Sequence, residues 1–246
     1  MFSEMAARNL ERIERNPYPG RGIIIGMTLD GTRMMFVYWL MGRSENSRNR
    51  IFVEEPDGIR TQAFDPSKLT DPSLIIYWPA RRVGTLHLVT NGDQTDTLAR
   101  LMKEGSSFDD ALMTREFEPD PPNWTPRISG MADVADPTGS YRLSILKTQD
   151  GDPASCVRCF YRYDKAIQGF GHCIHTYRGD GNPLPSFSED PYPVPVPDTA
   201  EEAVALYWPL LNRDNRVALF ARTIDRDTGE VETRLVNRHT RMRQEE

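Results

Sequence analysis

The fold class is decided by one stretch of sequence, GIIIGMTLDGTRMMFVYWLM at residues 22–41. Two apolar runs, 22–29 and 32–41, are rich in β-branched and aromatic side chains, and Asp30-Gly31 separates them. An Asp-Gly pair between two such runs is the strongest short signal for a β-hairpin. The sequence therefore predicts two antiparallel strands at this place.

The same signals recur along the rest of the chain. The predicted further strands are 51–54, 59–64, 74–78, 83–90, 127–134, 141–147, 155–163, 172–177, 216–224 and 231–237. Apolar periodicity and capping residues predict helices at 2–14, 95–103, 107–115 and 199–211. Many strands with helices in separate blocks indicate an α+β fold. We expect a single domain over residues 1–246, with an amino-terminal helix within 1–15 and a proline-rich crossing segment at 183–197.

Composition excludes several classes of protein. The chain has 246 residues with 30 Lys+Arg against 36 Asp+Glu, so its formal net charge is −6, which argues against a nucleic-acid-binding surface. No apolar run approaches the ~20 residues of a membrane helix, and no signal-peptide core is present. Three cysteines, an odd number, do not make a disulfide framework. We therefore expect a soluble, cytoplasmic protein with no nucleic-acid or membrane partner.

An arginine-rich loop, Gly42 to Arg50, directly follows the first predicted hairpin. Guanidinium groups pair bidentately with phosphate oxygens, and neighbouring hydroxyl and amide groups add neutral donors. Arg43, Ser44 and Arg50 are therefore candidate phosphate ligands. The alternative is a solvated, charged hairpin loop.

A second polar segment, Val89 to Asp96, reads as a buried strand, a glycine turn and a helix start. Backbone N–H groups at a helix start bind anions or polar ligand edges, and Asn91 and Thr95 add side-chain contacts there. The alternative is that Asp93 or Thr95 simply caps the helix.

A third segment is acidic and rich in proline. Residues 116–120, Glu-Phe-Glu-Pro-Asp, precede Trp124-Thr-Pro-Arg127 and lead into a predicted strand. Acidic and basic groups held together in a pocket keep a general base ionised. An exposed loop with ordinary surface charges has the same sequence pattern.

The cysteines and histidines imitate a zinc pattern, with Cys156 and Cys159 followed by His172 and His175. Both pairs fall in predicted strands, where residues i and i+3 point to opposite faces, and the gap between the histidines is shorter than usual. Buried thiols and structural histidines are the favoured interpretation. A Cys–His nucleophile pair stays open, although no local signature supports it.

In their order along the chain, these segments resemble the archaeal-type inosine monophosphate (IMP) cyclohydrolase family, including its bacterial branch. The matching stretches lie between residues 20 and 130 and are Gly20-Arg21-Gly22, Arg43-Ser44 to Asn49-Arg50, Tyr77 after Asp71-Pro72, Val89 to Gly92 with Thr95-Asp96, and Glu118-Pro-Asp120 leading to Thr125 to Ile128. The arginine loop is longer than in the archaeal pattern, and 119–124 carries an extra residue. Gly171 to Tyr177 and Gly179 to Gly181 match only loosely.

The resemblance implies an activity and a fold. The family converts 5-formamidoimidazole-4-carboxamide ribonucleotide (FAICAR) to IMP and water, the last step of de novo purine biosynthesis. It implies a four-layer αββα sandwich like that of the amino-terminal-nucleophile (Ntn) hydrolases. We expect no cofactor and no catalytic metal, because the sequence has no compact cluster of carboxylates and histidines near the matched motifs. The catalytic amino-terminal residue of those hydrolases is not visible here, because a helical segment precedes Arg21.

The resemblance also implies residue roles. Arg43, Ser44 and Arg50 would hold the 5′-phosphate, Asn91 and the Gly92 backbone the carboxamide or ribose, and Thr95 and Arg127 would complete the substrate site. Glu118 would be the base or proton shuttle, Tyr77 would hydrogen-bond the formyl oxygen, and Arg21 would stabilise charge there. A homo-oligomer is left open. Two alternatives remain: a non-catalytic nucleotide- or phosphate-binding protein, and an amidohydrolase that uses Cys156, Cys159 or Cys173 as nucleophile.

Overall fold

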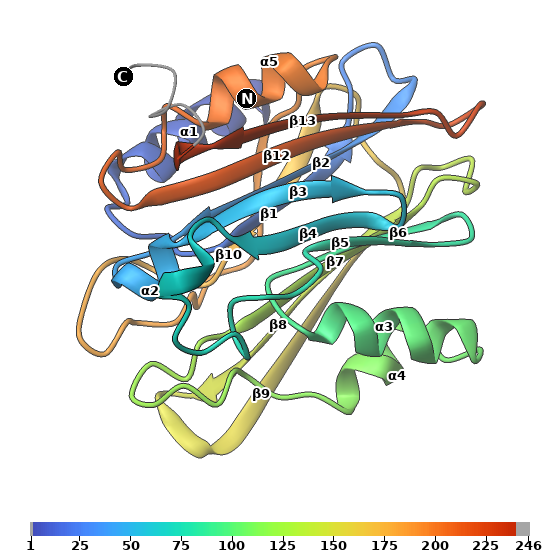
Figure 1. The fold of residues 1–246 in the computed structure, drawn as a ribbon. Coiled ribbons are helices and arrows are strands. Elements are labelled where there is room, and N and C mark those ends of the chain that lie inside the picture. Colours follow the sequence, from blue (N-terminus) through green and yellow to red (C-terminus); the bar gives the residue numbers. More distant parts are fainter. Residues whose placement is uncertain (1, 240–246) are drawn as a thin grey trace.

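The computed structural model describes residues 2–239, so Met1 of the expected amino-terminal helix and residues 240–246 lie outside the described part. The described chain is an α+β structure with two antiparallel sheets (Figure 1). The six-stranded sheet has the order β11 (Tyr192–Pro195), β10 (Phe170–His175), β1 (Gly22–Met27), β2 (Arg33–Met41), β12 (Arg216–Asp225), β13 (Val231–Asn237). The seven-stranded sheet has the order β3 (Arg50–Glu55), β4 (Gly58–Ala63), β5 (Ala80–Val83), β6 (Leu86–Thr90), β7 (Arg127–Asp133), β8 (Tyr141–Gln149), β9 (Asp152–Tyr163).

The hairpin predicted at residues 22–41 is confirmed as β1 and β2. The two strands pair from Gly22 opposite Trp39 to Met27 opposite Met34. Gly31 in the connecting turn has φ of +76°, a conformation that glycine adopts without steric cost. Every residue of β1 is buried, because β1 lies inside its sheet between β2 and β10 and the sheet is covered on both faces.

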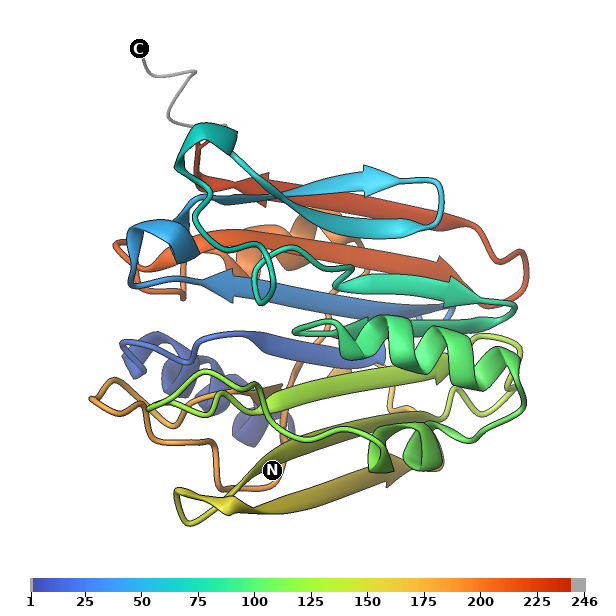
Figure 2. The same cartoon turned by 60° about the horizontal axis from the view of Figure 1, so that its bottom comes forward.

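The two sheets pack face to face around one apolar core. Aromatic contacts join them: the ring of Phe52 on β3 lies 5.7 Å from that of Tyr38 on β2 and 5.5 Å from that of Phe220 on β12. Helices α1 (Phe2–Arg15) and α5 (Ala200–Tyr207) pack on strands of the six-stranded sheet. Helix α3 (Gln94–Lys103), a green helix at the front of Figure 2, packs on β5 and β6. It also packs on α4 (Phe108–Met113), with which it shares a smaller apolar cluster.

Three sequence predictions needed correction. The predicted strand at 74–78 is a turn, in which the backbone N–H groups of Ile75 and Ile76 donate to the carbonyl of Pro72. The arginine loop contains a short helix, α2 (Glu45–Arg48), which Ser44 caps. The proline-rich segment at 183–197 contains β11, which lies at a sheet edge, where prolines do not interrupt the hydrogen-bonding ladder.

Other boundaries moved by a few residues. The last predicted helix ends at Tyr207 rather than at residue 211. The expectation of a single domain over residues 1–246 stays a prediction. Among residues 2–239, no helix is both long and apolar enough to cross a membrane.

Candidate active site

One cleft of about 320 Å³ lies where the strands of the two sheets end. It collects Arg21 from the start of β1, Arg43 from the end of β2, Arg50 from the start of β3, Glu118 from the loop before β7 and Tyr177 from beyond β10. Strands that are antiparallel neighbours bring the start of one and the end of the next to the same edge, so residues far apart in sequence meet here. Most of the residues predicted from the arginine loop and the acidic segment therefore share one cavity.

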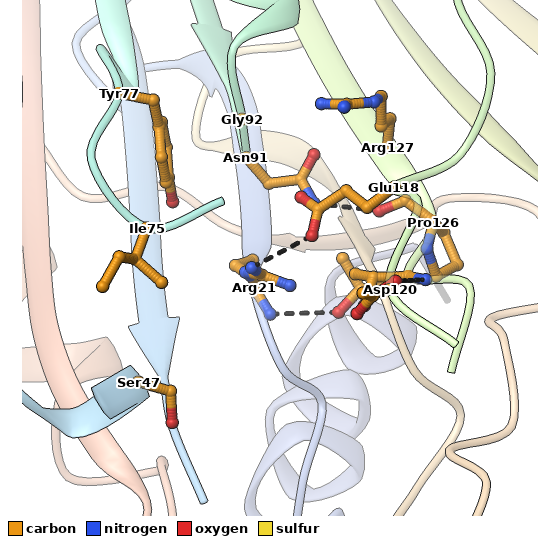
Figure 3. A network of polar contacts seen from close by, with 12 residues as sticks. Arg21, Ser47, Ile75, Tyr77, Asn91, Gly92, Glu118, Asp120, Pro126 and Arg127 are labelled. Atoms are coloured by element: carbon orange, nitrogen blue, oxygen red, sulfur yellow. Dashed lines mark hydrogen bonds and ion pairs between the residues drawn. The ribbon is translucent and has the colours of Figure 1, made fainter. Parts of the chain in front are cut away.

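A buried ion pair joins the two sheets inside this cleft. Arg21 Nη2 lies 3.4 Å from Glu118 Oε2, and Glu118 is 1% exposed (Figure 3). Burial raises the pKa of Glu118, against the lowering effect of Arg21 and Arg127. Burial acts to lower the pKa of Arg21, but Glu118 together with Tyr77, Tyr177 and Tyr38 outweighs it and raises that pKa well above its ordinary value. Arg21 therefore stays charged, and Glu118 is protonated more easily than an exposed glutamate.

Arg50 is the most deeply buried of the predicted phosphate ligands, at 1% exposure. Its Nε donates to the carbonyl of Ser47 at 2.8 Å, which fixes the guanidinium against α2. Burial lowers the pKa of Arg50, and the like charge of Arg21 adds to this effect.

Three of the charged groups that line the cleft have a buried atom without a hydrogen-bond partner among the described residues: Arg21 Nε, Arg50 Nη1 and Glu118 Oε1. A buried polar atom left unpaired costs about 1–3 kcal/mol, and more when the group is charged. Their gathering at one cleft is the feature expected of a site that completes its hydrogen bonds with a ligand.

Arg43 has a protein partner in place of a ligand. Its Nη1 donates to Asp180 Oδ1 at 2.6 Å and to the carbonyl of Gly181 at 2.9 Å. Its guanidinium lies 5.2 Å from the ring of Tyr18, and its side chain is 35% exposed. A phosphate bound by Arg43 must therefore compete with Asp180.

Tyr77 is not among the residues that line the cleft, but it lies next to Ile75, which is, and its hydroxyl points toward Ile75 (Figure 3). Its side chain is 4% exposed, and its hydroxyl lies 2.7 Å from that of Tyr38. Thr61 fixes the backbone of Tyr77, because Tyr77 N donates to Thr61 Oγ1 and Thr61 N donates to the Tyr77 carbonyl.

The segment after β6 is hydrogen-bonded to the start of β7 and to the start of α3. Asn91 donates to the carbonyl of Pro126 at 2.9 Å and accepts from Ile128 N at 2.8 Å and from Gln94 Nε2 at 2.9 Å. Thr95 Oγ1 donates to the carbonyl of Gly92 at 3.1 Å. The side chains of Asn91 and Thr95 thus form hydrogen bonds within the protein, and neither residue lines the cleft.

Gly92 and Arg127 stand beside the buried carboxylate. A Cβ on Gly92 would lie 2.7 Å from Arg127 Nη1 and 3.3 Å from Glu118 Oε1, so a larger residue would displace the ends of these side chains. Arg127 Nη1 also forms an ion pair with Asp93 Oδ1 at 2.6 Å. Gly92 therefore leaves room for Arg127 and Glu118 in their present positions, and Asp93 holds Arg127 in place.

Sequence reasoning missed several residues of the cleft. Tyr18 and Tyr177 stack with ring centroids 5.8 Å apart, and Asp120 Oδ1 accepts a hydrogen bond from Thr125 N at 2.6 Å. Asn123 and Leu184 complete this side of the cavity. Asp120 occurs in a stretch matched to the family and Tyr177 in one that matches only loosely, whereas the sequence around Tyr18 gives no functional signal.

The cysteines and histidines do not form a site. Cys156 packs with the α3–α4 cluster and Cys159 with the core between the sheets, so they point to opposite faces of β9 as predicted. His172 Nδ1 lies 2.6 Å from the hydroxyl of Tyr141, and His175 Nδ1 lies 2.9 Å from the carbonyl of Tyr177. Within residues 2–239, no group of His, Cys, Asp and Glu side chains is arranged to hold a metal ion.

The cysteines are also poorly placed to act as the nucleophile of an amidohydrolase. Burial raises the pKa of Cys173 to about 12, and its Sγ donates to the hydroxyl of Tyr192 at 3.5 Å. A thiol with so high a pKa is a poor nucleophile at neutral pH. None of the cysteines of the described chain lines the cleft.

Comparison with known proteins identifies the family. Residues 18–229 match the family model described as IMP cyclohydrolase-like protein. An IMP cyclohydrolase from Methanopyrus kandleri is 36% identical over 147 residues, which make up 55% of this chain and 71% of that protein. The resemblance inferred from the sequence is thus confirmed for the family, although not for its bacterial branch. The chain belongs to the IMP cyclohydrolase-like family, a family of purine-biosynthesis enzymes.

Proposed function

We propose that this chain is an IMP cyclohydrolase that binds FAICAR in the cleft and closes its purine ring, releasing IMP and water. The observation that carries the proposal is the set of unpartnered charged atoms, Arg21 Nε, Arg50 Nη1 and Glu118 Oε1, at one cleft of a protein of this family. FAICAR offers what this set lacks: phosphate oxygens, a formyl oxygen and an amide N–H.

The 5′-phosphate lies at Arg50, with Arg43 and Ser44 at the outer edge. Arg50 is held by Ser47 and keeps one nitrogen unpartnered, so it is prepared for a charge-assisted hydrogen bond. Arg43 contributes after its contact with Asp180 is exchanged for phosphate.

Ring closure then needs orientation and two proton transfers. The carboxamide nitrogen attacks the formyl carbon of the same molecule, a C–N bond forms, and Glu118 takes the proton from nitrogen. The attack is intramolecular, so holding the formyl group in the reactive orientation removes much of the barrier. Arg21 and Tyr77 stabilise the charge that develops on the formyl oxygen. The proton held by Glu118 then passes to that oxygen, which becomes the hydroxyl of a carbinolamine.

Loss of water completes the reaction. The Glu118 carboxylate takes the proton of the former formamido nitrogen and delivers it to the carbinolamine hydroxyl, so that the C–O bond breaks, the C=N bond forms and water leaves. A carboxyl group whose pKa is raised by burial suits both transfers, because it is a stronger base than an exposed glutamate and is readily protonated. Arg127, beside Glu118 Oε1, limits that rise.

The fold proposal is a four-layer αββα sandwich similar to that of the Ntn hydrolases. Its support is that α1 and α5 contact strands of the six-stranded sheet, whereas α3 contacts β5 and β6 of the other sheet. Arg21 follows an amino-terminal helix, so the chemistry of an amino-terminal nucleophile has no counterpart in the proposed mechanism.

The test is an ultraviolet assay of ring closure with purified protein and FAICAR. We expect turnover that is unaffected by thiol alkylation and by dialysis against a chelator, and strongly reduced in Glu118→Gln. Binding of IMP without turnover would instead support a non-catalytic nucleotide-binding protein. Activity lost on alkylation would support the cysteine amidohydrolase.

A further inference from the structure

Tyr38 is a buried tyrosine in the middle of β2, next to the site but outside the cleft. It is 0% exposed, and its ring packs against those of Phe52 and Phe220 at 5.7 and 5.6 Å. Its hydroxyl has one hydrogen-bond partner among the described residues, the hydroxyl of Tyr77 at 2.7 Å. A purely apolar phenylalanine would fill the same space, so the hydroxyl group needs an explanation.

The surroundings of the two hydroxyls decide which one donates. A buried O–H left without an acceptor costs free energy, and Tyr77 is the one hydrogen-bond partner of the Tyr38 hydroxyl among the described residues. By geometry alone either hydroxyl can be the donor. The charges of Arg21 and Arg50 act on both tyrosines, and more strongly on Tyr77, which is thus the hydroxyl nearer the charged groups of the cleft. If Tyr38 donates, the second proton lies on Tyr77, where a ligand in the cleft can accept it; the reverse direction leaves that proton on Tyr38 inside the core. The first arrangement is therefore favoured.

If Tyr38 donates to Tyr77, the proton of the Tyr77 hydroxyl must point elsewhere. With one lone pair of its oxygen occupied by Tyr38, the Tyr77 O–H has no acceptor within residues 2–239 and is free to meet an acceptor atom of a ligand. A hydroxyl that accepts one hydrogen bond also becomes a better donor, because such chains polarise one another. Burial raises the pKa of Tyr38 well above its ordinary value, so it remains a proton donor at any working pH.

We propose that Tyr38 is a positioning residue for ring closure: its hydroxyl donates to Tyr77 and thereby directs the Tyr77 proton to the formyl oxygen of the substrate. This rests on the proposed function, because it assigns an acceptor to the Tyr77 proton. Tyr38 itself never touches the substrate.

The first experiment is a double-mutant cycle on turnover. Tyr77→Phe should lower kcat by about 10²-fold or more, and Tyr38→Phe by about three- to tenfold with KM changed less than about twofold. In the Tyr77→Phe background, Tyr38→Phe should have no further effect on kcat, because its effect passes through Tyr77. Equal effects of Tyr38→Phe in both backgrounds, or no effect on wild-type kcat, would overturn the proposal.

The second experiment measures melting temperature in the same variants and needs no turnover. Tyr77→Phe leaves the Tyr38 proton unpaired and should lower Tm by about 2–6 °C, whereas the double variant should regain part of that loss. Tyr38→Phe should lower Tm less than Tyr77→Phe does, because Tyr77 still faces two arginines. The opposite order of the two single variants would show that Tyr77 is the donor and would refute the proposal.

A matched control is Tyr207→Phe. Tyr207 is also buried and its hydroxyl donates to the carbonyl of Pro195, away from the cleft. It should lose stability and keep wild-type kcat, and a fall in its kcat comparable to that of Tyr38→Phe would show a general effect of losing a buried hydroxyl. Inactive wild-type protein would reject the proposed function itself, whereas active wild-type protein with an unchanged Tyr38→Phe variant rejects only the role of Tyr38.

Discussion

Replacing Arg50 by methionine should weaken nucleotide binding while leaving the unliganded protein at least as stable. Arg50 keeps Nη1 unpartnered at 1% exposure, so a phosphate oxygen gains a charge-assisted hydrogen bond there. Such contacts contribute about 1.5–3 kcal/mol. Arg50→Met should therefore raise the Kd for IMP by about 10- to 150-fold.

The expected stability of the unliganded Arg50→Met variant follows from the burial of Arg50. The guanidinium is desolvated and lies near the like charge of Arg21, and both effects lower its pKa. Methionine fills a similar length without charge and loses one hydrogen bond, from Nε to Ser47. We expect Tm of the unliganded protein to stay unchanged or rise by up to about 4 °C, since about 1 kcal/mol corresponds to 2–4 °C in a chain of this size.

Calorimetric titration with IMP and with inosine, which lacks the phosphate, separates the outcomes. Inosine affinity should change less than about twofold, because the removed contact is to phosphate. Arg43→Met should raise the Kd for IMP only about three- to tenfold, because the phosphate must first displace Asp180 from a half-exposed pair. An equal loss for inosine and IMP, or a marked fall in Tm with unchanged IMP affinity, would refute the assignment.

Three further predictions concern the buried carboxylate. Glu118→Gln should lower kcat by about 10²–10⁴-fold, with IMP affinity changed less than about fivefold; near-wild-type kcat in folded variant protein would reject Glu118 as the proton-transferring group. Burial raises the pKa of Glu118 above its unfolded value, so the stability that this group contributes is present at low pH and lost as pH rises through the folded pKa. Melting curves from pH 4 upward should show this loss in the wild type and not in Glu118→Gln. Gly92→Ala should lower kcat and Tm together, because its Cβ would meet Arg127 Nη1 at 2.7 Å; a fully active and stable variant would show that the contact relaxes without consequence.

The sequence predicted the local elements well, because their signals act within a few residues. Asp30-Gly31 marks the first hairpin, and the capping box of Thr199 and Glu202 is present at the start of α5. The predicted strand at 74–78 failed for a different reason. Ile75 and Tyr77 are hydrophobic and buried, but they are buried by packing of a turn against the core. Tyr77 has one backbone hydrogen bond from Thr61 of β4, and within residues 2–239 neither residue belongs to a paired strand. Periodicity does not distinguish these two origins of burial.

The site was predictable only through the resemblance to a family. Arg21, Arg50 and Glu118 meet because their strands end at one edge, which no local pattern encodes. The contact of Arg43 with Asp180 joins residues 137 positions apart, so the competition at the phosphate site was not foreseen. Asn91 was expected to contact the substrate, but its side-chain amide is hydrogen-bonded to the backbone at Pro126 and Ile128. The sequence around an asparagine does not show whether its amide will bind the protein backbone or a ligand.

The order of the strands in the two sheets also affects which sheet can form first as the chain is synthesised. The seven-stranded sheet is a meander in which each strand pairs with the next along the chain, from Arg50 to Tyr163. The six-stranded sheet joins β1 and β2 to β10 and β12, which are synthesised only after that meander is complete. Pairings of such long sequence separation form slowly, and an unpaired apolar strand edge promotes aggregation. A ribosome-bound chain that stops before Arg216 should therefore hold a folded meander and an incomplete cleft-bearing sheet, with β2 exposed to chaperones.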